Sequence, residues 1–113
     1  MAKAMERFGL EITRDQNGPT VAIRGELDAY TAPRLRKLTE LLVDGSALKL
    51  VFDLSETTFV DSTGLGVLVG AARRARGQDM EVVLDRPTAA VFRVLEITGV
   101  SVAIPVRNPP GRV

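Results

Sequence analysis

The stretch from residue 48 to residue 76 constrains the fold most, because two different hydrophobic periods follow each other in it. Residues 48–54 form a mainly apolar run with β-branched and aromatic members, which predicts a buried strand. After the Asp-Ser-Thr-Gly sequence at 61–64, apolar residues recur at helical spacing from Leu65 to Ala72. A buried strand followed by an amphipathic helix indicates an α/β fold.

The segments around this stretch supply further strands and helices in alternation. Residues 8–12 and 21–23 show the two-residue period of strands, and the Asn-Gly sequence between them favours a tight turn, so we expect an antiparallel hairpin. Further along, the expected elements are a helix beginning at Thr31 and stopped by Asp44 and Gly45, the strand at 48–54, a helix beginning at Ser62, a strand at 80–84, a helix between Pro87 and Gly99, and a short last strand within 102–106.

The sequence therefore predicts one domain over residues 1–113, with the order β-β-α-β-α-β-α-β. We expect a mixed, mostly parallel β-sheet that begins with the N-terminal antiparallel hairpin and is packed with α-helices. Its core should span residues 8–106. Proline and glycine after residue 108 disfavour regular structure, so residues 107–113 should form a mobile tail.

Composition excludes several classes of function. The chain has no cysteine and no histidine, so disulfides, thiol chemistry and a Ser-His-Asp triad are impossible. Its net charge is +1, with no long run of one sign, which argues against nucleic acid as the main partner. No apolar stretch is long enough to span a bilayer and no signal peptide is recognisable, so we expect a cytoplasmic protein without a membrane partner. Nothing marks a metal site.

Ser62 stands where the second helix is expected to begin, and two interpretations of it remain open. In the first, it is an ordinary N-cap whose hydroxyl accepts a hydrogen bond from a backbone N–H two or three residues on. In the second, its hydroxyl is placed for covalent modification, since a phosphate there would meet the amides and positive pole of a helix N-terminus. Local spacing does not separate the two, because a good cap is also a good phosphate seat.

Three glycines in the same helix, Gly64, Gly66 and Gly70, partly match a dinucleotide-binding motif, with Asp85 ending the next strand about 20 residues later. Their spacing deviates from the motif, a loop separates them from their strand, and the chain lacks room for a second nucleotide-binding half. The alternative is structural. Close packing on the sheet, or the close approach of a partner, would compensate the cost of about 1 kcal/mol that each glycine carries inside a helix.

Two aspartates, Asp28 and Asp61, stand at the ends of expected elements. Turn and cap chemistry is the common reason for an aspartate in such a place. The functional alternative places both beside Ser62, on the rim where strands end and helices begin, because ligands and partners of open α/β sheets gather on that rim.

Three segments together resemble the STAS domain of bacterial anti-anti-sigma factors. They are Gly-Glu-Leu-Asp at 25–28, Thr-Ala-Pro-Arg-Leu at 31–35 and Asp-Ser-Thr-Gly-Leu-Gly-Val-Leu at 61–68. The resemblance covers residues 8–106 in order and with matching spacing. It implies a STAS-like single domain and no enzymatic activity. Two departures are visible: Pro109 and Pro110 stand where the family usually adds a helix, and Arg86 stands before Pro87 where a serine-type cap is frequent.

The resemblance also implies a function by partner switching. The unphosphorylated form would bind an anti-sigma factor that is also a serine kinase and thereby free the sigma factor, in a stress response or sporulation. The kinase, using its own ATP, would phosphorylate Ser62, with Thr63 as a minor candidate, and a serine phosphatase would restore it. No cofactor is expected on this chain. The implied partner-binding residues are Asp28, Asp61, Ser62, Thr63, Gly64, Leu65 and Gly66.

Two other functions stay open at this point. One is a STAS scaffold protein of a signalling complex, against which a serine at position 62 argues. The other, from a different class, is a small nucleotide-binding protein, on the strength of the helix glycines and Asp85. The sequence names neither the cognate anti-sigma factor nor the sigma factor that it controls.

Overall fold

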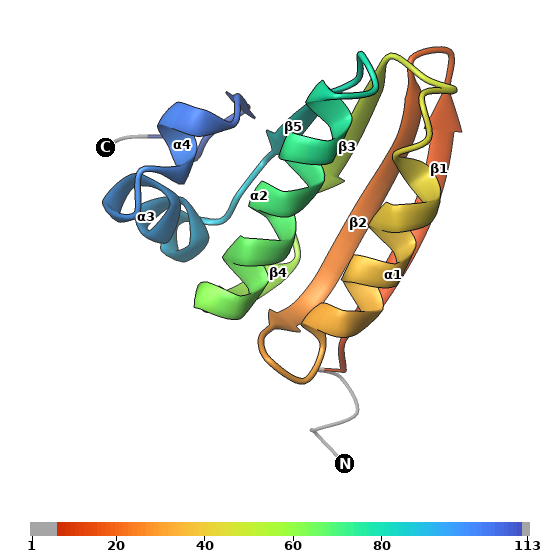
Figure 1. Ribbon diagram of the computed structural model, residues 1–113. Helices are drawn as coiled ribbons and strands as arrows, with labels where there is room; N and C mark the ends of the chain where they lie inside the picture. The colour runs from red at the N-terminus through yellow and green to blue at the C-terminus, as the bar shows by residue number, and fades with distance from the viewer. Residues whose placement is uncertain (1–6, 112–113) are drawn as a thin grey trace.

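A mixed six-stranded β-sheet forms the centre of the computed structural model, which describes residues 7–111. The first two strands pair antiparallel and all other pairs are parallel. The strand order is β1-β2-β3-β5-β6, and β4 pairs with the far end of β2 (Figure 1). The strands are β1 (Gly9–Asp15), β2 (Gly18–Leu27), β3 (Lys49–Asp53), β4 (Thr57–Val60), β5 (Glu81–Asp85) and β6 (Val106–Arg107).

Two long helices lie side by side on one face of the sheet, and two shorter ones lie together beyond β5 (Figure 1). The bounds are α1 (Ala32–Leu42), α2 (Ser62–Arg76), α3 (Ala89–Ile97) and α4 (Val100–Ala103). Each of α1, α2 and α3 has the apolar stripe that such one-sided packing requires. The expected α/β class, the opening hairpin and the parallel remainder of the sheet are confirmed.

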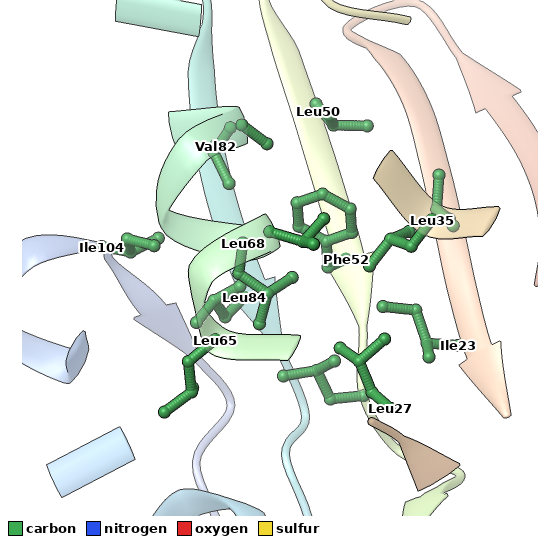
Figure 2. Packing of buried hydrophobic residues seen from close by; sticks show 14 of the residues in the cluster. Ile23, Leu27, Leu35, Leu50, Phe52, Leu65, Leu68, Val82, Leu84 and Ile104 are labelled. Atoms are coloured by element: carbon green, nitrogen blue, oxygen red, sulfur yellow. The ribbon is translucent and has the colours of Figure 1, made fainter. Parts of the chain in front are cut away.

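The hydrophobic core fills the space between the sheet and the two long helices (Figure 2). Phe52 of β3 and Leu84 of β5 are fully buried there, opposite Leu35 of α1 and Leu68 of α2. The continuous apolar run of β3 thus reflects burial in the middle of the sheet rather than a two-residue alternation.

The sequence interpretation did not include β4 as a strand. We expected a loop between the strand at 48–54 and the helix at Ser62, but residues 57–60 of this segment form a short strand. In the structure, Phe59 pairs with Glu26 and Val60 with Leu27, after a register shift in β2. Thr57 is buried and its hydroxyl donates to the carbonyl oxygen of Ile23 at 2.6 Å. This tertiary pairing, which no local pattern reveals, makes the strand.

The last part of the chain also differs from expectation. A strand was expected within 102–106, but residues 100–103 form α4 and only Val106 and Arg107 form β6. Gly99, with a φ of 82°, ends α3 and turns the chain directly into α4. Short apolar runs are compatible with either structure, so the period alone did not distinguish them.

The tail begins later than expected. Arg107 belongs to β6, and both Arg107 and Asn108 hold the Asp85 carboxylate. Beyond them, the mobility of the tail stays a prediction, and its residues 112–113 lie outside the described part.

Gly64 fixes how closely α2 approaches the sheet. A Cβ at this position would lie 2.7 Å from both the carbonyl oxygen and the Cγ of Leu27, at the end of β2. Gly66, two residues later on the same helix, would meet no atom within 4 Å. The two glycines therefore have different causes: the first is required by packing, and the second leaves bare backbone at the surface.

We predict opposite effects on stability for alanine at these two glycines. Gly64→Ala should lower the free energy of unfolding by about 1–3 kcal/mol, because the backbone of β2 does not yield to a new methyl group. Gly66→Ala should raise it by up to about 1 kcal/mol through helix propensity. Urea denaturation of both variants measures the difference. Equal effects would contradict the close approach of α2 to Leu27.

Candidate functional site

The pairing of β2 with β4 brings the two predicted aspartates to the same edge of the sheet. Leu27 lies opposite Val60 in parallel register, and the backbone N–H of Asp61 donates to the carbonyl oxygen of Leu27 at 3.2 Å. Asp28 and Asp61, the next residue of each strand, therefore leave the sheet together. The expected grouping of both with Ser62 on the rim is what this geometry produces.

Asp61, and not Ser62, caps α2. Asp61 has an extended backbone, and its Oδ1 accepts a hydrogen bond from the backbone N–H of Gly64 at 3.0 Å. Ser62 is the first residue of the helix and is exposed, as is Thr63. The interpretation of Ser62 as the N-cap is therefore wrong. Aspartate and serine are equally good caps, and the β2–β4 register decides between these neighbours.

Asp28 organises the loop that runs beside this helix start. Its Oδ1 accepts hydrogen bonds from the backbone N–H groups of Tyr30 and Thr31 at 2.9 and 3.1 Å. Thr31 occupies the N-cap position of α1 but makes no side-chain cap bond; its hydroxyl instead donates to the carbonyl oxygen of Glu26 at 2.8 Å. Asp28 is half-buried, so it has a role in the turn besides any role in binding.

The seven predicted site residues divide into a surface and its support. Ser62, Thr63 and Gly66 are exposed, and Asp28 and Asp61 are half-buried. Gly64 and Leu65 are buried beneath them. These two therefore position the helix start rather than offer contacts on the free chain.

Tyr30 is a surface residue that the sequence interpretation passed over. Its side chain is 92% exposed, next to Asp28 in the loop before α1. Aromatic residues are enriched at protein interfaces, so an exposed tyrosine beside the predicted site is a candidate contact. The sequence clue to an exposed tyrosine was its place among turn-forming residues, where no apolar period predicts burial.

The features behind the nucleotide-binding alternative have structural explanations. Gly64 is required by packing against Leu27. Asp85 is buried and accepts hydrogen bonds from Arg107 at 3.2 Å and Asn108 at 3.0 Å. Burial raises the pKa of Asp85, but these hydrogen bonds outweigh it and hold the pKa below its ordinary value of 3.8. The carboxylate therefore serves to attach β6 to β5.

Within residues 7–111, no group of three or more carboxylates is placed to hold a metal ion. None of the helices in this part of the chain has the length and apolar character to cross a bilayer.

We predict that the stability of α2 depends on Asp61 rather than on Ser62. Asp61→Ala should cost about 1 kcal/mol, the usual worth of a cap, whereas Asp61→Asn keeps an oxygen acceptor and should cost less. Ser62→Ala should change stability by less than about 0.5 kcal/mol, as surface substitutions do. Thermal or urea unfolding measures all three. A Ser62→Ala cost as large as that of Asp61→Ala would contradict the observed cap.

Comparison with known proteins shows the family to which the chain belongs. Residues 10–106 match the family model described as "Mlab, STAS domain". An anti-sigma-B factor antagonist from Listeria monocytogenes is 40% identical over 98 residues, which cover 87% of this chain and 86% of the relative. Among solved structures, an anti-sigma factor antagonist from Mycobacterium paratuberculosis has a TM-score of 0.77 and 26% identity, covering 90% of this chain and 86% of that one.

SpoIIAA, also an anti-sigma factor antagonist, shares the fold at 20% identity. Its unphosphorylated form has a TM-score of 0.75, covering 94% of this chain and 90% of that one. Its phosphorylated form, from Bacillus, has a TM-score of 0.70, covering 94% and 93%. By the family match and the 40% identity, the chain belongs to the STAS-domain family of anti-sigma factor antagonists.

Proposed function

We propose that the unphosphorylated chain binds an anti-sigma factor that is also a serine kinase, and so frees a sigma factor in the cytoplasm. The observation that carries this proposal is the exposed hydroxyl of Ser62 at the first position of α2, on the rim that Asp28 and Asp61 share. Phosphorylation of Ser62 by that kinase, with its ATP, ends the binding. A serine phosphatase restores it, and the chain itself is not an enzyme.

The surroundings of Ser62 suit a charge that blocks a contact without disturbing the fold. The N-terminal end of α2 favours an anion by about 0.3–1 kcal/mol. Against this, the Asp61 carboxylate is next door and already accepts from the Gly64 amide, so a phosphate has fewer free donors there. A partner lying close over Ser62 and Gly66 would have to desolvate the dianion, which costs several kcal/mol unless it is paired.

The half-buried position of Asp28 suggests that it sets the shape of the surface beside Ser62. Through the amides of Tyr30 and Thr31, its carboxylate holds the loop that presents the Tyr30 ring. The proposed partner-binding surface therefore includes Asp28 and Tyr30. It also includes Asp61 and Thr63, which lie on either side of Ser62 in the sequence. Gly64 and Leu65 support it from below.

The first test is the site of phosphate transfer. With ATP and the purified anti-sigma factor of the same organism, Ser62→Ala should abolish incorporation of phosphate, whereas Thr63→Ala should retain it. Because Ser62→Ala leaves the Asp61 cap intact, circular dichroism of the variant should match the wild type. Incorporation that persists in Ser62→Ala and disappears in Thr63→Ala would move the site by one residue.

The second part of the test is binding. Calorimetric titration of the same anti-sigma factor should give at least tenfold weaker binding for the phosphorylated chain, or about 1.4 kcal/mol. Ser62→Asp should have a smaller effect, because it adds one negative charge where a phosphate adds nearly two. Equal affinities of the phosphorylated and unphosphorylated forms would contradict the proposed switch.

A further inference from the structure

Charge is distributed unevenly between the two long helices and the rest of the molecule. Although the chain as a whole has a net charge of only +1, α1 and α2 expose six basic side chains and one acidic side chain, Glu40. We refer to the six as the basic helix surface: Arg34, Arg36, Lys37, Arg73, Arg74 and Arg76.

None of these six side chains forms an ion pair within residues 7–111. Arg74 donates to the hydroxyl of Thr39 at 2.8 Å, and Arg34 stacks over the ring of Phe8 at 5.1 Å. The ion pairs of the described chain lie elsewhere, on the sheet and its loops: Lys49 with Glu81, Arg86 with Asp53 and Asp85, and Arg107 with Asp85. Among residues 7–111, the acidic side chains therefore form no ion pair with the basic helix surface.

The helix dipole accounts for only half of this surface. The three arginines of α2 lie in its last turn, where the negative pole favours them. Arg34, Arg36 and Lys37 lie in the first half of α1, towards the positive pole, and the first turn of α1 has no acidic residue. Basic side chains are disfavoured at that end, so their presence needs a different cause.

The basic helix surface is continuous with the proposed site. Ser62, Gly66 and Arg73 lie within about 40° of one another around α2, so they share one face of the helix. Arg74, the next residue, lies further round the helix, on the side of α1. Gly66 leaves that face bare. The hydrogen bond from Arg74 to Thr39 links this face to α1, which packs alongside α2 (Figure 1).

We propose that the surface for the anti-sigma factor extends from Ser62 along α2 to the basic helix surface, and that the partner presents acidic side chains there. This rests on the proposed function, and it adds the chemistry of the partner. Exposed apolar groups stand at both ends of α1, with Tyr30 92% exposed before it and Leu41 73% exposed near its end. Arginine mixed with aromatic and apolar side chains is typical of a protein interface.

An acidic partner also explains how a phosphate at Ser62 would act at a distance. A dianion on the same helix face reduces the positive field that attracts the partner, so it slows the encounter as well as weakening the final contact. The basic helix surface would thus set the association rate, and Ser62 would set whether the close contact forms.

The test compares two charge-matched double variants in the association rate with the purified anti-sigma factor of the same organism. Arg36→Glu/Arg73→Glu reverses two charges of the basic helix surface. Arg24→Glu/Arg93→Glu reverses two exposed charges away from α1 and α2, one on the face of β2 that points away from the buried residues and one on α3. Circular dichroism and thermal unfolding should show that both variants keep the fold. Stopped-flow rates are measured at about 0.05 M and about 0.5 M salt, because screening shortens the reach of charges roughly threefold between them.

We expect Arg36→Glu/Arg73→Glu to lower the association rate constant at least fivefold at low salt and less than twofold at high salt. The matched variant should change the rate less than twofold at either. Equal slowing of both variants, or of neither, would overturn the acidic partner surface, as would a loss confined to binding of duplex DNA or phosphatidylserine vesicles. If the wild type does not bind the anti-sigma factor, the proposed function fails as well; if binding persists but ignores phosphorylation, the switch fails and the basic helix surface stands.

Discussion

The structure depends above all on the close approach of the first turn of α2 to the end of β2. Leu27 takes part in three contacts at once: it pairs with Val60, its carbonyl oxygen accepts from the Asp61 amide, and it packs against the space that Gly64 leaves. These contacts set where the helix begins and which residue becomes exposed at its first position. The exposure of Ser62 at the start of α2 is therefore determined by packing between segments more than 30 residues apart in the sequence.

Because of this arrangement, neighbouring residues at the start of α2 have different structural roles. Asp61 caps the helix, Gly64 and Leu65 pack under it, and Ser62 is left without a structural bond to lose. Because the Ser62 side chain makes no hydrogen bond within residues 7–111 that stabilises the fold, a change of its charge should cost little stability. Asp85, at the end of β5, has a structural role instead. Its carboxylate accepts hydrogen bonds from Arg107 of β6 and from Asn108, the next residue.

Much of the fold and of the site could be predicted from the sequence. The apolar run at 48–54, the Asn-Gly turn and the helical periods give the sheet class and the main helices, because burial imposes these patterns locally. The strand at 57–60 and the cap at Asp61 could not be predicted from the sequence, because both depend on pairing with β2. Asp28, Asp61 and Ser62 do follow paired strand ends at one edge of the sheet, whereas their role in binding a partner stays a prediction. The cap and the packing contacts that distinguish these residues depend on distances, which sequence spacing does not give.

The central claim is that a phosphate at Ser62 changes the surface and not the fold. The most direct measurement is the comparison of backbone amide NMR spectra of the unphosphorylated and phosphorylated chain. We expect chemical-shift changes confined to residues 28–31 and 61–66, with the amides of buried residues such as Phe52 and Leu84 unmoved. Changes that spread through the core strands, or the loss of the α2 signals, would show that the switch works by unfolding and would contradict the account.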